Sequence, residues 1–271
     1  MTNWLITGCS TGFGRVLAEK ALARGDRVAA TARRPETLAA LAQQYPDTAL
    51  CLELDVTRPD TIASAIAAAR DRFGRIDVVV NNAGFGVQGA VEEVSDAQIH
   101  ELFAVNVFGV IDVIRAALPT LREQGGGHIV NVTSVGGRTS VPLVALYSAC
   151  KFAVEGLSMG LAMELEPFGI KVTTVAPGAF ATNFANRVEP PASRLPAYDA
   201  THDAINSVLE GMAYADPAGC VDLILQVVDA AEPPRQIVAG GFALSAVEQV
   251  MTAQMEEMKA WRAVSEAADA G

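Results

Sequence analysis

Short β-branched runs alternate with longer helical patterns along almost the whole chain, and this alternation restricts the fold more than any other feature of the sequence. The runs, such as "VVVNN" and "HIVNV", are nearly continuous in apolar residues, as is typical of strands covered on both faces. A chain of this kind forms a parallel sheet with right-handed crossovers, wound in both directions from its middle. We therefore predict an α/β fold of about seven parallel strands with helices on both faces. The predicted strands are Trp4–Thr7, Arg27–Thr31, Ala49–Leu54, Ile76–Asn81, His128–Thr133, Lys171–Ala176 and Gln236–Ala239.

The helical stretches between these runs end where helices commonly stop. "GRVLAEKALARG" ends at Gly25 and "RPDTIASAIAAARDRFG" ends at Gly74, and glycine often follows the last residue of a helix. No linker, repeat or low-complexity tract divides the chain. The sequence therefore predicts one domain over 1–242, with 243–271 as a helical extension of the same domain.

Two regions interrupt the alternation. From about 183 to 217 the chain contains four prolines and no predicted strand, and a long insertion after a strand commonly forms a lid or pocket wall. The tail from Ala243 to Ala268 has the pattern of a helix. We expect this helix to pack over the end of the domain, with a subunit contact or a cap on the pocket as the alternatives.

Composition excludes several classes of function. The net charge of −11 argues against a broad basic face for nucleic acid or an anionic membrane surface. No uncharged run reaches the ~18 residues of a membrane helix. The four cysteines and three histidines are scattered, so we expect no metal site and no disulfide framework. The chain begins in strand-like sequence without a basic leader, and the expected location is the cytoplasm.

The first predicted strand leads directly into the glycine-rich stretch "TGCSTGFG", Thr7 to Gly14, and then into a helix. Glycines let backbone amides approach a pyrophosphate, and the N-terminus of the following helix adds positive partial charge. The spacing of Gly8, Gly12 and Gly14 is T-G-x-x-x-G-x-G. This strand, turn and helix together predict a dinucleotide-binding loop.

With this loop, the chain resembles the short-chain dehydrogenase/reductase family, whose members have a Rossmann-type fold. The resemblance covers roughly 3–239 and also rests on "NNAG" at 81–84, "LDV" at 54–56 and "PGAFAT" at 177–182, each following a predicted strand. By this resemblance, "NNAG" braces the sheet beside the adenosine, "LDV" borders the adenine, and "PGAFAT" surrounds the nicotinamide. The implied cofactor-binding residues are Gly8, Ser10, Thr11, Gly12, Phe13, Gly14, Arg33, Arg34, Asp55, Val56, Asn82, Ala83, Gly84, Tyr147, Lys151, Pro177, Gly178, Phe180 and Thr182.

The end of the second strand indicates which nicotinamide cofactor is used. An enzyme that prefers NAD usually has a carboxylate here to bind the ribose 2′-hydroxyl, but in this chain Ala32 is followed by Arg33 and Arg34. A guanidinium suits a 2′-phosphate, and Thr11 offers a further donor. We expect NADP(H), with Arg33 as the main phosphate contact. The alternatives are that both arginines are merely solvated and that the cofactor is NAD(H).

The stretch "LYSACKF" places Tyr147 four residues before Lys151. On a helix these side chains lie on one face, and the cation would lower the tyrosine pKa below its usual ~10. Taken alone, the pair is better explained as a packed tyrosine and a lysine that reaches water. The family resemblance implies catalysis: Tyr147 as acid/base, Ser134 in "NVTSVGG" as a donor to the substrate oxygen, and Lys151 also as a ligand of the nicotinamide ribose. Asn106 in "FAVNVFG" matches the family asparagine that holds a water linking Lys151 to solvent.

The sequence is less specific about the substrate and the assembly. The residues expected to border the pocket are mostly apolar, which favours a hydrophobic ketone, aldehyde or secondary alcohol; they are Phe85, Val135, Leu143, Phe180, Phe184 and Tyr198. Two further interpretations are a nucleotide-sugar epimerase or dehydratase, whose usual loop T-G-x-x-G-x-x-G is absent here, and a non-catalytic NADPH sensor. The apolar helix Phe152–Leu165 predicts a homodimer or homotetramer.

Overall fold

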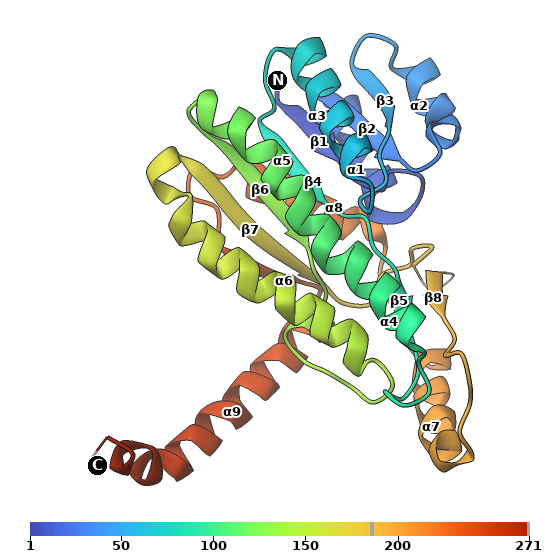
Figure 1. Ribbon diagram of the computed structural model, residues 1–271, viewed down its shortest axis with the longest axis vertical. Coiled ribbons are helices and arrows are strands. Elements are labelled where there is room, and N and C mark those ends of the chain that lie inside the picture. The colour runs from blue at the N-terminus through green and yellow to red at the C-terminus, as the bar shows by residue number, and fades with distance from the viewer. Residues whose placement is uncertain (185–186, 270–271) are drawn as a thin grey trace.

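In a computed structural model of the chain, which describes residues 1–184 and 187–269, a seven-stranded parallel sheet forms the centre of the molecule (Figure 1). The strand order is β3-β2-β1-β4-β6-β7-β9. The strands are β1 (Asn3–Ile6), β2 (Arg27–Ala32), β3 (Ala49–Glu53), β4 (Val78–Asn81), β6 (Gly127–Val132), β7 (Ile170–Pro177) and β9 (Gln236–Ala239). All seven predicted strands are confirmed, and no end is shifted by more than two residues.

The strand order reverses next to β1, and this reversal determines where a ligand can bind. β1 pairs with β2 on one side, where Leu5 is opposite Ala29, and with β4 on the other, where Leu5 is opposite Val79. The connections that leave β1 and β4 therefore run to opposite sides of the sheet. In such folds the resulting crevice lies at the carboxyl ends of the strands.

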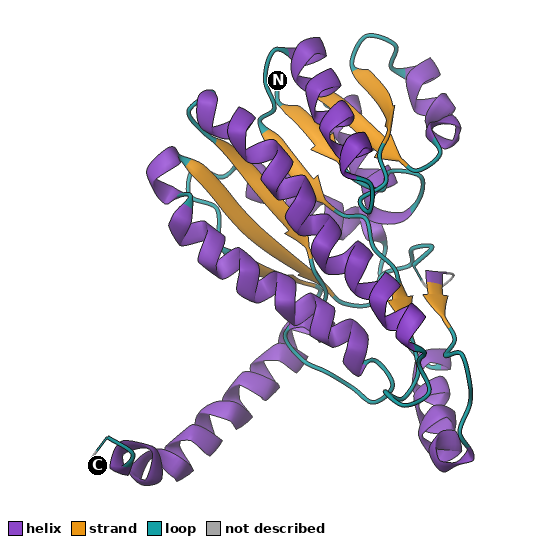
Figure 2. Cartoon of the chain, in the orientation of Figure 1, coloured by secondary structure: helices purple, strands orange, loops and turns teal. Residues whose placement is uncertain are grey.

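Helices cover both faces of the sheet (Figure 2). Along β1, Trp4 and Ile6 pack in one core cluster, and Leu5 packs in another on the opposite face. The first cluster contains α1 (Gly12–Ala23), α2 (Ala39–Gln44) and α8 (Pro217–Asp229); the second contains α3 (Pro59–Phe73), α5 (Gly109–Glu123) and α6 (Ala145–Glu164). Burial of both strand faces explains why the strand sequences are apolar without alternation.

A capping box starts the helical segment that leads into α5. The Ser95 hydroxyl accepts a hydrogen bond from the Gln98 amide, and the Gln98 side chain accepts one from the Ser95 amide, at the start of α4 (Asp96–Phe103). A π-helical turn, Ala104–Phe108, joins α4 to α5. The continuous helix Asp96–Glu123 is long and apolar enough to cross a membrane, since an 18-residue window of it has a mean hydropathy of 1.7. In this fold the buried face of α5 packs against the sheet.

The segment predicted as a lid, 183–217, contains a strand that the sequence did not predict. Val188–Glu189 forms β8, which pairs in parallel with β5 (Gly86–Val87). The expectation of a strandless insertion is therefore wrong, because two residues are too few to give a periodic pattern. The segment continues into α7 (Asp199–Glu210). Positions 185–186 of the predicted lid and 270–271 of the predicted extension lie outside the described residues.

A buried, hydrogen-bonded pair of side chains fastens the lid to the rest of the protein. Glu93, just before α4, accepts a hydrogen bond from the Leu195 amide at 2.8 Å and contacts His202 of α7 at 2.7 Å. Both side chains are almost completely buried. Despite its burial, the Glu93 carboxyl has its pKa lowered to about 2 by the hydrogen bonds from the Leu195 and Ala90 amides and from His202. The carboxylate therefore holds the lid in place while it is ionised.

The C-terminal helix α9 (Gly241–Ala267) extends away from the body of the molecule (Figure 1). Only Ala243 and Val247 at its start are buried, whereas Met251, Met255, Met258 and Trp261 are exposed. The prediction of a helix here is confirmed, but the expectation that it packs over the end of the domain is wrong beyond its first two turns. An amphipathic pattern indicates that one face is covered, but it does not identify the covering surface.

Candidate active site

Two adjoining cavities lie at the carboxyl edge of the sheet, where the reversal of strand order predicts a crevice. One, with a volume of about 420 Å³, is lined by Tyr147 and Lys151, and we call it the tyrosine cavity. The other, of about 530 Å³, is lined by Arg33 and Arg34, and we call it the arginine cavity. Four residues line both: Gly8, Ala83, Gly84 and Arg187. Together the cavities form one groove that crosses the edge of the sheet.

The glycine-rich loop forms the floor of this groove. A Cβ atom on Gly14 would lie 2.7 Å from the Gly8 carbonyl oxygen and closer still to the Asn82 side chain, so only glycine fits there. Asn82 donates hydrogen bonds to the Thr7 and Gly8 carbonyl oxygens at 2.8 and 3.2 Å. This bracing by "NNAG" fixes the loop. No side chain caps the N-terminus of α1, which leaves its first amides as a site for an anion.

The arginine cavity has a cationic wall and no carboxylate at the end of β2. The strand ends at Ala32, and Arg33 and Arg34 follow as exposed side chains. Across the cavity, one oxygen of Asp55 accepts hydrogen bonds from the amide and hydroxyl of Thr57 at 2.9 and 2.7 Å. Val56 lines the same wall. The side chains beside β2 therefore favour an anionic group over a hydroxyl.

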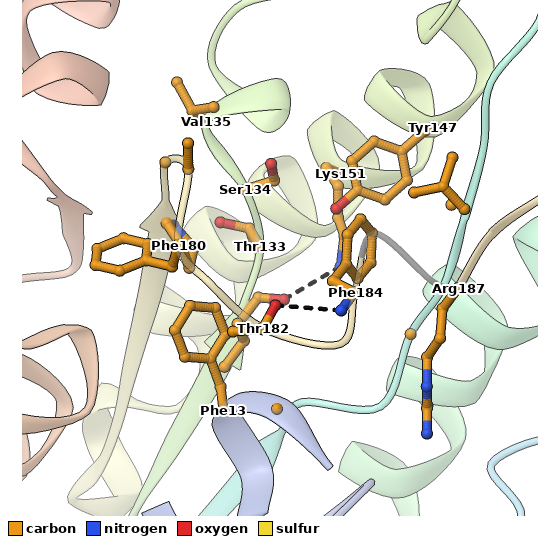
Figure 3. Close-up of a pocket in the computed structure, with 18 of the residues that line it drawn as sticks. Phe13, Thr133, Ser134, Val135, Tyr147, Lys151, Phe180, Thr182, Phe184 and Arg187 are labelled. Atoms are coloured by element: carbon orange, nitrogen blue, oxygen red, sulfur yellow. Dashed lines mark hydrogen bonds between the residues drawn. The ribbon is translucent and has the colours of Figure 1, made fainter. Parts of the chain in front are cut away.

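Ser134, Tyr147 and Lys151 line the tyrosine cavity together (Figure 3). Ser134 lies two residues after the end of β6, and its hydroxyl accepts a hydrogen bond from the Gly136 amide at 3.1 Å. Tyr147 and Lys151 lie one turn apart on α6. The Lys151 ammonium donates to the Val132 carbonyl oxygen at 3.2 Å. Thus β6 and α6 bring together the three residues that the sequence singled out.

Burial changes the acidity of the tyrosine and the lysine in opposite directions. It raises the pKa of the Tyr147 phenol well above its ordinary value, and the neighbouring Ser134 hydroxyl lowers it by less. Burial also lowers the pKa of the Lys151 ammonium to about 8, against the opposite effects of Cys150 and Glu155. The pKa of Tyr147 is therefore raised in the structure, and the prediction that Lys151 lowers it below its usual value is wrong. Removal of the phenol from water outweighs the attraction of a cation that also faces Val132.

Asn106 lies behind this group, in the π-helical turn, and is completely buried. Its amide nitrogen donates to the Phe85 and Leu102 carbonyl oxygens, both at 3.0 Å. Its amide oxygen has no hydrogen-bond partner among the described residues. A Cβ atom on Gly84 would lie 2.7 Å from this oxygen and 3.7 Å from the Lys151 ammonium. An unpaired acceptor and a buried cation thus flank the same glycine.

Comparison with known proteins agrees with this geometry. The family model described as "short chain dehydrogenase" matches residues 2–193. The chain belongs to the short-chain dehydrogenase family. Its sequence is 36% identical to Oxidoreductase BOA17 of Botryotinia fuckeliana over 267 residues, which is 97% of each chain. Its structure is similar to a short-chain dehydrogenase from Streptomyces avermitilis, with a TM-score of 0.91, 41% identity and 98% of both chains covered. It is an oxidoreductase of this family.

Similar structures contain either nicotinamide cofactor. A short-chain dehydrogenase/reductase from Burkholderia phymatum, in complex with NAD, has a TM-score of 0.79 and 26% identity, with 91% of this chain and 92% of that chain covered. A short-chain dehydrogenase from Burkholderia cenocepacia, in complex with NADP, has a TM-score of 0.76 and 26% identity, with 96% and 98% covered. These similar structures bind NAD or NADP, so the comparisons do not select one of the two.

In this short-chain dehydrogenase, nearly all of the residues singled out from sequence line the groove. Among the predicted catalytic and cofactor-binding residues, Gly14 and Asn106 do not line it, because each lies behind residues that do. The residues that line it are Gly8, Ser10, Thr11, Gly12, Phe13, Arg33, Arg34, Asp55, Val56, Asn82, Ala83, Gly84, Ser134, Tyr147, Lys151, Pro177, Gly178, Phe180 and Thr182.

The predicted substrate pocket is confirmed only in part. Val135, Phe180 and Phe184 line the tyrosine cavity, and Phe85 lines the arginine cavity. Leu143 lies outside the lining because its side chain is buried in the protein. Tyr198 also lies outside it, since its hydroxyl is bonded to Glu92. Sequence reasoning missed the lid residues that line the tyrosine cavity: Arg187, Val188, Leu209, Met212 and Tyr214.

A buried polar cluster below Ser134 was also missed. Glu155, one turn after Lys151 on α6, accepts hydrogen bonds from the hydroxyls of Thr133 at 2.6 Å and Thr174 at 2.7 Å. It also pairs with Arg138 at 2.9 Å. These bonds join α6 and β7 to Thr133, the residue before Ser134, so they fix the backbone that carries the Ser134 hydroxyl. No local motif marks a cluster whose members are so far apart in the sequence.

Proposed function

We propose that this short-chain dehydrogenase is an NADP(H)-dependent oxidoreductase that transfers hydride between nicotinamide and the carbonyl or secondary alcohol group of a hydrophobic substrate. One observation carries this proposal. Ser134, Tyr147 and Lys151 line a cavity that continues into a glycine-floored groove with a cationic far end. A site for proton transfer and a site for a dinucleotide phosphate are thus parts of one groove.

The groove has the donor groups that a nicotinamide dinucleotide requires. The uncapped N-terminus of α1 and the glycine-rich loop offer backbone amides to the pyrophosphate. Asp55, Val56 and Asn82 to Gly84 would border the adenosine, whereas Pro177, Gly178, Phe180 and Thr182 would surround the nicotinamide. The Phe13 and Phe180 rings meet edge to face, with centroids 5.5 Å apart, and both line the tyrosine cavity.

The side chains of the tyrosine cavity divide the acid–base work among them. The bound nicotinamide supplies or accepts the hydride. The Ser134 hydroxyl donates a hydrogen bond to the substrate oxygen, which contributes about 10²–10³ in rate in comparable sites. Tyr147 gives its phenolic proton to that oxygen in reduction and takes it back in oxidation, a positioned transfer that contributes about 10²–10⁴.

Lys151 and Asn106 support the tyrosine. A charged Lys151 stabilises the phenolate that remains when Tyr147 has given up its proton, and it also binds the nicotinamide ribose. The unpaired amide oxygen of Asn106 is suited to a water that connects the ammonium to solvent. The pKa of Lys151 near 8 keeps most of it charged at neutral pH.

Three features support NADP(H) over NAD(H). The end of β2 carries no carboxylate, two arginines follow it, and no acidic side chain pairs with either arginine within residues 1–184 and 187–269. A guanidinium binds a phosphate dianion through charge-assisted hydrogen bonds. With NAD(H), both arginines would lie beside a neutral ribose hydroxyl without an anion to bind.

An apolar substrate is supported by the wall opposite Tyr147. The Tyr147 and Phe184 rings lie 5.7 Å apart, and other apolar side chains continue this wall: Val135, Val144, Val188, Leu209, Met212 and Tyr214. A hydrophobic ketone, aldehyde or secondary alcohol fits a wall of this kind.

We also propose a cytoplasmic location, since NADPH is present in that compartment.

The direct test is a screen of carbonyl compounds in which the consumption of NADPH or NADH is followed by absorbance. We expect turnover of apolar ketones or aldehydes with NADPH and much slower turnover with NADH. Tight binding of NADPH without turnover of any compound would instead support a non-catalytic sensor. Preference for NADH would support the NAD-dependent alternative.

A further inference from the structure

We propose that Arg187, a lid residue, is a phosphate-binding residue of the cofactor site and links the lid to the adenosine side of the dinucleotide. The inference rests on the proposed function, since it concerns the same groove. The inference adds a cofactor contact from the lid, which lies outside the nucleotide-binding motifs of the sequence.

Arg187 lies at the junction of the two cavities. It is one of the four residues that line both, and the only one of them with a charged side chain. Its guanidinium donates to the hydroxyl of Ser10, in the glycine-rich loop, at 3.0 Å. A lid residue is therefore bonded to the loop that would receive the dinucleotide phosphates.

The direction of the side chain points to the cofactor and not to the substrate. In Figure 3 the Arg187 side chain extends away from the Tyr147 ring. Its guanidinium contacts Ser10, which lines the arginine cavity together with Arg33 and Arg34. A substrate anion bound by Arg187 would consequently lie away from the tyrosine.

The Arg187 guanidinium lies near a second positive charge, that of Arg33. Burial lowers the pKa of the Arg187 guanidinium, and the nearby charge of Arg33 lowers it further. In the part of the chain that the structure describes, no carboxylate forms an ion pair with Arg187, Arg33 or Arg34. Asp55, Glu101 and Glu189 line the arginine cavity without pairing with these arginines. A bound phosphate would relieve the repulsion between Arg187 and Arg33.

The backbone on the C-terminal side of Arg187 is held by regular pairing. Val188 and Glu189 form β8, paired with Gly86 and Val87 of β5. The Gln88 amide extends the ladder by donating to the Glu189 carbonyl oxygen at 3.0 Å. The arginine therefore comes from a strand end anchored beside "NNAG", which favours a preformed contact over a chance position of a surface side chain.

The test is the dissociation constant of NADPH and of NADH, measured by the fluorescence of the reduced nicotinamide or by calorimetry, without substrate. We expect Arg187→Ala to weaken NADPH binding about 10-fold or more, and Arg187→Lys to retain part of the affinity. The matched control is Arg194→Ala, which removes a lid arginine that pairs with Asp199 at 3.2 Å and lines neither cavity. Circular dichroism and the Tm verify that each variant folds.

The two nucleotides distinguish which phosphate Arg187 binds. A loss confined to NADPH would assign the 2′-phosphate, and an equal loss for both would assign the pyrophosphate; either supports the proposal. Unchanged dissociation constants for both in folded Arg187→Ala, with the wild-type protein binding normally, would overturn it. If the wild-type protein bound neither nucleotide, the proposed function would fail and this inference with it.

Discussion

The ammonium nitrogen of Lys151 lies 5.7 Å from the centroid of the Tyr147 ring, one turn further along α6. Burial disfavours the charged form of both side chains, since it raises the pKa of the tyrosine and lowers that of the lysine. In this buried site, a phenolate beside a charged ammonium has a lower free energy than either ion would have without the other. The proton transfer assigned to Tyr147 therefore depends on the charge of Lys151.

This dependence predicts how activity varies with pH. The pKa of Lys151 is lowered to about 8, so the ammonium is charged below that pH and loses its proton as the pH rises through it. Because kcat/KM reports ionisations of the free enzyme, we expect kcat/KM for carbonyl reduction to fall with a midpoint near pH 8. The measurement is a pH profile in buffers of constant ionic strength. A profile that stays level to pH 10 would contradict the role of the lysine.

Glu155 offers a second arm of the same test. Its carboxylate raises the pKa of Lys151, so we expect Glu155→Gln to move the midpoint of the profile to lower pH. Glu164→Gln, at the exposed end of the same helix, is the matched control and leaves the midpoint unchanged. If Glu155→Gln altered only the Tm, the carboxylate would serve the fold alone.

A second prediction concerns the choice of cofactor. If Arg33 binds the 2′-phosphate, Arg33→Ala weakens NADPH binding about 10-fold or more and changes NADH binding by less than about 2-fold. Arg34→Ala has a smaller effect in the same direction. Arg262→Ala removes the same charge from α9, outside both cavities, and serves as the control. Equal losses of NADPH and NADH affinity would show that Arg33 does not distinguish them.

A third prediction concerns assembly. Phe152, Met159 and Met163 are exposed on α6, and apolar side chains gathered on one helix are typical of an interface. We expect a homodimer or homotetramer at micromolar concentration in light scattering. Met159→Glu lowers the measured mass, whereas Met255→Glu on α9 does not. A wild-type monomer would refute this prediction, and dissociation by Met255→Glu alone would assign the interface to α9.

The sequence predicts best what is encoded locally. The seven strands are recognisable because each is an apolar run bounded by turn residues, and Gly74 ends α3 in the left-handed conformation that such a stop requires. Most of the cofactor groove is predictable for the same reason, since its residues follow strands at the carboxyl edge of the sheet. Ser134, Tyr147 and Lys151 come together because one strand and the next helix carry them.

Tertiary packing determines what the sequence could not reveal. The pKa of Tyr147 is raised because the fold removes the phenol from water, which the i, i+4 spacing to Lys151 does not indicate. Arg187 reaches Ser10 only because a two-residue strand, too short for any periodic signal, pairs with β5. The exposed apolar residues of α9 have the same pattern as those of a covered helix, so their exposure was not predictable.

The central claim is that Tyr147 exchanges a proton with the substrate oxygen beside a bound nicotinamide. Its most direct test is Tyr147→Phe, which removes only the hydroxyl, with turnover and the NADPH dissociation constant measured on the same preparation. We predict that kcat falls by at least about 100-fold while the dissociation constant stays within about 2-fold of the wild-type value. A variant that keeps its turnover would contradict the claim.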